Sequence, residues 1–180
     1  MKQLIIFDLD ATLVNTQLPE EGKKIWLEKT GEPWNFRGWW GRAESLDLNV
    51  FEHPRNEWVY EQYLKSLELE DAKRITLTGR IHGLLDKVED LLHHNGITEM
   101  DGIFCNGCLD GKVTRTEWFK LKVLGNFIKE HGDTLERVVM YDDREAHFGY
   151  FKKWAVETQK RTGIKVVMDK IVDGRGHYEL

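Results

Sequence analysis

The chain has 180 residues, of which 41% are hydrophobic, so it can bury the core of one sizeable domain. No apolar run approaches the ~20 residues needed to cross a bilayer, and a net charge of −5 disfavours a protein whose whole surface follows a nucleic-acid backbone. Only two cysteines are present, and the chain runs from Met1 directly into an apolar strand, which argues against a secreted disulfide scaffold. We expect one cytoplasmic domain over 1–180, with neither a membrane partner nor an obligate protein partner.

The first predicted strand, 4–9, is a β-branched apolar run that ends in two carboxylates, Asp8 and Asp10. In an open parallel sheet, ligands bind beyond the carboxyl ends of the strands, so these two side chains are candidate site residues. On this stretch alone, an acidic turn without a function is the alternative.

Strand and helix patterns alternate along most of the chain. Further strands are predicted at 74–78, 102–105, 138–142 and 165–168, and helices at 83–94, 116–131 and 145–161. This alternation predicts an α/β fold with a parallel sheet and helices on both faces.

An insertion over 17–72, after the first strand, is too long for a plain connection and is expected to form a cap. It holds five of the seven tryptophans and has a charge balance of its own that is acidic. Trp39 and Trp40 lie beside arginines, a combination that can stack bases and bind phosphates. The alternative is a small aromatic core that orders the insertion. A helix over 56–67 is expected to pack the insertion onto the sheet.

The strand at 74–78 runs into Thr78, Gly79 and Arg80, which offer a hydroxyl, a close backbone approach and a cation to a phosphate. Cys105 and Cys108 have the spacing of half a zinc site, but the chain has no second cysteine pair, and we expect no role for them.

Lys120 falls in the middle of the apolar face of the helix at 116–131, whereas Lys122 points away from it. A lysine on a buried face needs an anionic partner, and Lys120 lies in the first turn, close to the expected carboxylates.

The strand at 138–142 repeats the opening design and closes on Asp142 and Asp143. In a sheet of order 3-2-1-4-5 it lies next to the first strand, which brings four carboxylates together. Each like-charged pair at ~4 Å costs about 4 kcal/mol at an effective dielectric of 20, so the cluster needs a cation, and Mg²⁺ suits oxygen ligands. Arg144 is expected to brace this cluster, and His147 to pack in the core.

Together these motifs resemble the haloacid dehalogenase (HAD) superfamily of phosphatases. More narrowly, they resemble its Swiss Army Knife RNA-repair-like family and the phosphatase domains of polynucleotide kinases. The motifs that carry the resemblance are Phe7-Asp8-Leu9-Asp10, Gly38-Trp39-Trp40, Leu77-Thr78-Gly79-Arg80, Thr116-x-x-Phe119-Lys120 and Tyr141-Asp142-Asp143-Arg144-x-x-His147-x-x-x-Phe151. Ala11 departs from the pattern, because the wider superfamily usually has Gly there.

The resemblance implies a Rossmann-like sheet and a magnesium-dependent phosphomonoesterase. Asp8 would form an aspartyl-phosphate, while Asp10 would act as the general acid and base. Thr78 and Lys120 would neutralise the phosphoryl oxygens. The metal would be held by Asp8, the backbone carbonyl of Asp10, and Asp142 or Asp143, and the substrate by Gly79, Arg80, Trp39 and Trp40.

A polynucleotide end, as in a 3′-phosphatase, is the leading candidate substrate. A small metabolite or nucleotide is the enzymatic alternative, which the acidic charge favours. A non-catalytic binding module on the same fold is the second alternative, although a protein without catalysis would be free to lose the intact acidic and cationic residues.

Overall fold

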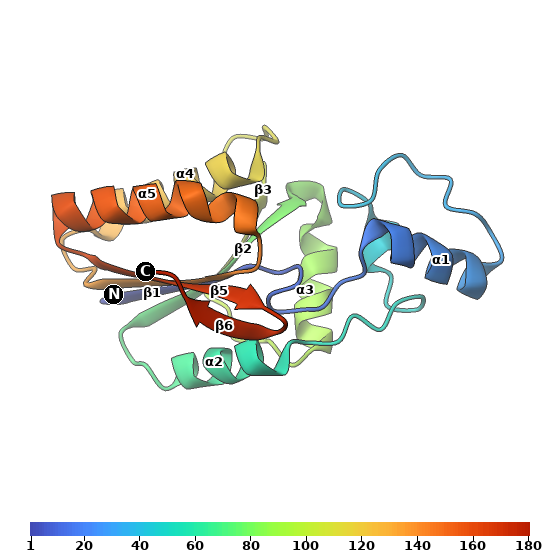
Figure 1. Cartoon of the computed structure of the whole chain (residues 1–180), viewed down its shortest axis with the longest axis horizontal. Coiled ribbons are helices and arrows are strands. Elements are labelled where there is room, and N and C mark those ends of the chain that lie inside the picture. Colours follow the sequence, from blue (N-terminus) through green and yellow to red (C-terminus); the bar gives the residue numbers. More distant parts are fainter.

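The computed structural model describes residues 1–180 (Figure 1). The strands are β1 (Gln3–Phe7), β2 (Ala72–Ile81), β3 (Gly102–Asn106), β4 (Arg137–Asp142), β5 (Lys165–Val172) and β6 (Arg175–Tyr178). The α-helices are α1 (Pro19–Thr30), α2 (Glu57–Leu67), α3 (Leu85–His94), α4 (Thr116–His131) and α5 (Glu145–Thr162), and short 3₁₀ turns span Ala43–Leu46 and His82–Leu84. None of these helices has the length and apolar character that a membrane crossing requires.

The strands form one six-stranded sheet of order β3-β2-β1-β4-β5-β6. The expected order 3-2-1-4-5 is confirmed, and all pairs among these five strands are parallel. β6 was not expected, and it pairs antiparallel with β5. The turn that joins them contains Asp173 and Gly174, both in left-handed conformations that suit a tight hairpin.

Helices cover both faces of the sheet, with α4 and α5 on one face and α2 and α3 on the other (Figure 1). The alternation of side chains along β1 explains the two cores. Leu4 and Ile6 belong to the cluster beneath α4 and α5, whereas Ile5 and Phe7 belong to the cluster beneath α2 and α3. Because both faces of β1 are buried, the strand is apolar until it reaches Asp8.

The predicted insertion divides into two parts. Its last helix, α2, supplies Val59 and Tyr63 to the sheet core and so serves as the crossover helix between β1 and β2. The part that contains α1 projects away from the sheet (Figure 1). The prediction that a helix at 56–67 packs the insertion onto the sheet is confirmed, and only the segment before α2 projects as a cap would.

The projecting segment is ordered by an aromatic cluster, and this corrects the expectation for Trp39. Its side chain is 3% exposed, and its indole N–H donates to the Gln17 carbonyl at 3.0 Å. It packs against the rings of Trp34 and Phe51, and a Cβ added to Gly22 would lie 2.2 Å from it. Trp39 is therefore a core residue of the insertion and has no free face for a substrate, because an irregular segment needs aromatic bulk to hold its shape.

Candidate active site

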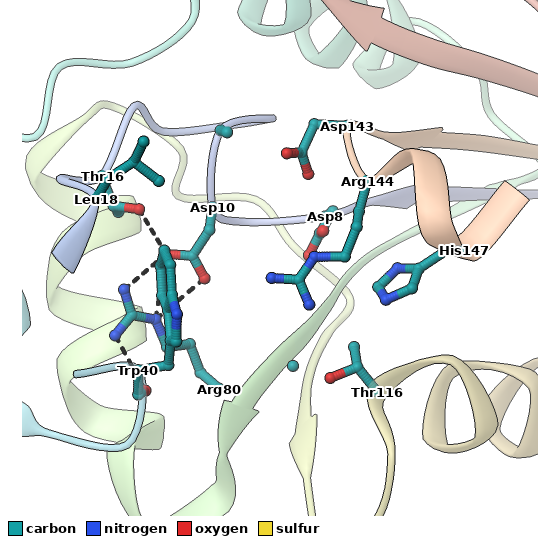
Figure 2. Close-up of a pocket in the computed structure, with 12 residues that line it drawn as sticks. Asp8, Asp10, Thr16, Leu18, Trp40, Arg80, Thr116, Asp143, Arg144 and His147 are labelled. Carbon is teal, nitrogen blue, oxygen red and sulfur yellow. Dashed lines mark hydrogen bonds and ion pairs between the residues drawn. The ribbon is translucent and has the colours of Figure 1, made fainter. Parts of the chain in front are cut away.

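A cavity of about 180 Å³ opens where β1, β2 and β4 end and where α4 and α5 begin. Parallel strands bring their carboxyl ends to one edge, so residues far apart in the sequence meet there. Figure 2 shows Trp40 and Arg80 on one side of this cavity and Arg144, His147 and Thr116 on the other. The lining residues are Asp8, Asp10, Ala11, Thr16, Leu18, Trp40, Gly79, Arg80, Thr116, Asp143, Arg144 and His147.

Asp8, Lys120 and Asp142 form a buried charge cluster beside the cavity. The Lys120 ammonium is 1% exposed and lies 2.8 Å from Asp8 Oδ2 and 2.6 Å from Asp142 Oδ2. Burial disfavours this ammonium, but attraction to Asp142 and Asp8 outweighs burial and raises the pKa of Lys120. The inference that the buried face of α4 directs Lys120 to the acidic edge is supported by these contacts, whereas the Lys122 side chain is 56% exposed and pairs with Asp110.

The two carboxylates of this cluster differ in their environments. Burial, reinforced by Asp142 and Asp143 and opposed by Lys120, raises the pKa of Asp8 to about 8. Burial also opposes ionisation of Asp142, but Lys120 and the neighbouring His147 outweigh it and lower the pKa of Asp142 to about 2. Asp142 also accepts the backbone N–H of Arg144 at 3.0 Å. Lys120 thus favours the ionised form of Asp142, and Asp8 is the carboxylate of this pair that lines the cavity.

Asp143 completes a group of three carboxylates that fits a hard cation. Oxygen atoms of Asp8, Asp142 and Asp143 lie within 4.8 Å of one another. Burial and the repulsion of Asp142 raise the pKa of Asp143 to about 6, so the cluster lacks positive charge. An all-oxygen donor set with such a deficit suits Mg²⁺. Asp143 lines the cavity whereas the side chain of Asp142 is fully buried, so Asp143 presents the more accessible oxygens.

Asp10 lies across the cavity from this group and is held by Arg80. The guanidinium of Arg80, itself 1% exposed, donates from Nη2 to Asp10 Oδ1 at 2.7 Å and from Nε to Oδ2 at 3.0 Å. The Thr16 hydroxyl donates to Oδ1 at 2.6 Å. Burial opposes ionisation of Asp10, but Arg80 and Thr16 outweigh it and lower the pKa of Asp10. The Asp10 carboxylate is therefore engaged with Arg80 and lies outside the three-carboxylate group, so any contact with a metal would have to come from its backbone.

Arg80 also connects the insertion to the site. Its Nη1 donates to the Trp40 carbonyl at 3.1 Å and to the Ser45 hydroxyl at 2.8 Å, and its guanidinium lies over the Trp40 ring, 4.9 Å from the centroid. Arg80 was expected to bind substrate, but the structure commits its donors to Asp10 and to the insertion. Arg80 is thus placed to orient Asp10. Trp40 does line the cavity, as expected of a substrate contact.

Two backbone features shape the wall of the cavity. Ala11, at the position where the superfamily usually has Gly, has φ of 54°, in the left-handed region that glycine tolerates best. A Cβ at Gly79 would lie 2.7 Å from the Thr116 hydroxyl oxygen, so Gly79 allows the first residue of α4 to approach the end of β2. The close approach at Gly79 is thus to the Thr116 side chain, and its expected approach to a phosphate stays a prediction.

Thr78 is fully buried, and its hydroxyl accepts the backbone N–H of Arg80 at 3.1 Å. It lies behind the cavity wall, whereas the sequence placed it at the phosphoryl group. Thr16, Ser45 and Thr116 were not expected at the site. Thr116 opens the motif that contains Lys120, and Thr16 lies six residues after Asp10 in the loop that follows β1, so both had a signal in the sequence. Ser45 contacts Arg80 only because of the way the insertion folds.

Arg144 and His147 complete the far side of the cavity (Figure 2). Arg144 was expected to brace the acidic group, but it does so through its backbone N–H, while its exposed guanidinium lines the cavity. His147 is 4% exposed and packs on Phe151, yet it also lines the cavity, with Nδ1 3.6 Å from Asp142.

Cys105 and Cys108 do not line the cavity. Burial raises the pKa of the Cys105 thiol to about 12, which leaves it protonated and unreactive at neutral pH.

Comparison with known protein families identifies the family of the chain. A family model described as HAD domain family 1 in Swiss Army Knife RNA repair proteins matches residues 25–173. Thr78, Lys120 and the Asp142-Asp143 pair fall inside the match, whereas Asp8 and Asp10 precede it. The fold is the Rossmann-like one expected of the superfamily, and membership supports a phosphatase type of function in general. Since the match covers most of the chain, the protein belongs to the HAD domain family 1 of Swiss Army Knife RNA repair proteins.

Proposed function

We propose that the protein is a magnesium-dependent phosphomonoesterase that works through an aspartyl-phosphate on Asp8. The observation that carries this proposal is the buried contact of Lys120 with Asp8, at 2.8 Å, beside a cavity that Asp8, Asp10 and Asp143 line. A nucleophilic carboxylate beside a fixed cation, with a second carboxylate opposite, is the set of groups that phosphoryl transfer needs.

Asp8 attacks the phosphorus, so that a P–O bond to the carboxylate forms while the bond to the leaving oxygen breaks. The leaving oxygen takes a proton from Asp10. In the second step Asp10 removes a proton from water, whose oxygen attacks the same phosphorus and releases inorganic phosphate and the free carboxylate. Lys120 and the guanidinium of Arg144 offset charge on the phosphoryl oxygens.

Asp8 and Asp143, with Asp142 behind them, would hold Mg²⁺, which would supply positive charge to the phosphoryl oxygens and favour the ionised form of Asp8. Within the chain itself, the ion pair with Arg80 favours the ionised form of Asp10. The ionised form is the one that activates water, so the ion pair between Arg80 and Asp10 favours hydrolysis of the aspartyl-phosphate more than its formation.

The leading substrate class is a phosphate at the end of a polynucleotide. The cavity of about 180 Å³ is smaller than the roughly 300–1,000 Å³ of typical small-molecule pockets, so a larger leaving group must lie mostly outside it. The family name, which refers to RNA repair, supports the same class. A small phosphorylated metabolite remains the second candidate, which the acidic net charge favours.

The test is phosphate release from a panel of 3′- and 5′-phosphorylated oligonucleotides, nucleotides and sugar phosphates, with Mg²⁺ or with a chelator. Asp8→Asn should abolish release without unfolding the protein, because an amide cannot serve as the nucleophile. Asp110→Asn is the matched control, since Asp110 pairs with the exposed Lys122 and lies outside the cavity. Full turnover by Asp8→Asn would refute the proposed nucleophile, and no release by the wild-type protein from any ester would favour a non-catalytic binding module.

A further inference from the structure

A cation between two exposed aromatic rings lies at the start of α4 and α5. The guanidinium carbon of Arg115 is 4.9 Å from the ring centroid of Trp118 and 5.9 Å from that of Tyr150. Trp118 is 55% exposed and Tyr150 is 43% exposed, so both rings keep much of their surface in solvent. An ion pair with Glu117, which is buried, holds Arg115 in place. We call Arg115, Trp118 and Tyr150 the aromatic rim.

The residues of the aromatic rim are close neighbours, in the chain, of two residues that line the far wall of the cavity. Thr116, which follows Arg115 in the chain, lines the cavity, and so does His147, which precedes Tyr150 by less than one turn of α5. Figure 2 places Thr116, Arg144 and His147 together on the side of the cavity opposite Trp40. A group attached to a phosphate in the cavity can therefore leave it toward α4 and α5 and meet these rings.

We propose that the aromatic rim binds the nucleoside adjacent to the scissile phosphate and so determines the preference for a nucleic-acid end. This inference rests on the proposed phosphatase function and names residues that neither the sequence patterns nor the family match assigned. The base stacks on the exposed surface that Trp118 and Tyr150 offer together, and Arg115, which lies against both rings, adds positive charge beside it.

The chemistry of the aromatic rim favours a nucleobase over other groups that could bind there. Every nucleobase has a π-face, so exposed aromatic rings bind single strands with little sequence preference. A sugar phosphate or a glycerol phosphate has no such face and gains little from two rings beside the cavity. Arg115 in the aromatic rim and Arg144 in the cavity wall both carry positive charge that complements a phosphate backbone, although the protein as a whole is acidic. The inference also moves the stacking function from Trp39, which is buried, to rings that are exposed.

The experiment compares kcat/KM for two substrates, an oligonucleotide with a terminal phosphate and glycerol phosphate. Trp118→Ala and Tyr150→Ala should each lower the ratio of oligonucleotide to glycerol phosphate about tenfold, mainly through KM, as expected for the loss of one stacked base. Trp118→Phe, which keeps a ring, should recover most of the ratio. Tyr178→Ala is the matched control, because Tyr178 is 72% exposed on the edge strand β6 and should leave the ratio unchanged. Melting temperatures should stay near wild type, since the replaced side chains are exposed.

The outcomes separate this inference from the proposed function. If the wild-type protein releases phosphate but Trp118→Ala and Tyr150→Ala affect both substrates equally, or neither, the aromatic rim only stabilises the helix starts and the inference fails alone. If the wild-type protein hydrolyses none of the substrates, the proposed function fails. The affinity for the same oligonucleotide, labelled with a fluorophore and measured by fluorescence anisotropy, then tests the aromatic rim by itself. An affinity about tenfold weaker in Trp118→Ala would support the aromatic rim, and an unchanged affinity would overturn it.

Discussion

Replacing Lys120 by Met removes a buried positive charge and keeps most of the side-chain volume. In the wild-type protein the ammonium lies 2.6 Å from the fully buried Asp142 carboxylate. At an effective dielectric of 20, this pair has a Coulomb energy of about 6 kcal/mol, most of which repays the removal of both charges from water. Breaking one side of such a pair leaves the other charge uncompensated, so we expect a loss of about 3–5 kcal/mol in the free energy of unfolding.

For a chain of this size, that loss corresponds to a melting temperature lower by roughly 6–20 °C, which thermal unfolding followed by circular dichroism measures. Phosphate release should fall by about 10²–10³-fold in kcat, because one fixed donor to the developing charge is lost. Lys122→Met is the matched control on the same helix. Its ion pair with Asp110 is about half exposed on both sides, so its loss should cost at most ~1 kcal/mol.

Equal shifts in melting temperature for the Lys120 and Lys122 variants would refute the reasoning, since they would mean that burial does not distinguish the two ion pairs. An unchanged kcat in a folded Lys120→Met protein would separately remove Lys120 from the chemistry.

Three further predictions follow from the site. Mg²⁺ should raise the melting temperature more at pH 8 than at pH 5. The pKa values of Asp8, about 8, and Asp143, about 6, are raised, so both carboxyls are protonated at low pH. As the pH rises through these values, the two carboxylates become charged and repel each other, and a bound cation then stabilises the folded state. An equal shift at both pH values, measured by differential scanning fluorimetry, would exclude these carboxylates as the binding groups. Trp39→Ala should cost about 3–5 kcal/mol of stability, whereas Trp40→Ala should leave the melting temperature within a few degrees and change KM instead; similar melting curves would contradict the assignment of Trp39 to the core. Arg80→Lys should keep the positive charge but lose the two hydrogen bonds that Arg80 donates to the Asp10 carboxylate, so the pKa of Asp10 should rise. The acidic limb of the pH–rate profile should then move to higher pH, and an unchanged limb would show that Arg80 does not set the pKa of Asp10.

The sequence by itself determined the α/β class of the fold and one edge of the site, whereas the expected strand order belonged to the resemblance to the superfamily. The apolar runs before Asp8 and Asp142, together with the alternation of strands and helices, indicated buried parallel strands, and such strands present whatever follows them at the same edge. The helical phase of α4 separated Lys120 from Lys122, because the period of 3.6 residues is a local property of the backbone. These inferences needed no knowledge of distant contacts.

Tertiary structure decided the parts of the site that come from irregular segments. The insertion before α2 has no periodicity from which a buried face can be read, so the sequence could not tell Trp39, which fills its core, from Trp40, which lines the cavity. The sequence also could not show that Arg80 binds Asp10, because the position of the Arg80 guanidinium depends on how the insertion folds back over β2. The Trp40 carbonyl, which accepts a hydrogen bond from Arg80, belongs to that insertion. Adjacent residues of similar chemistry were separated here by packing alone, and packing is a property of the whole chain.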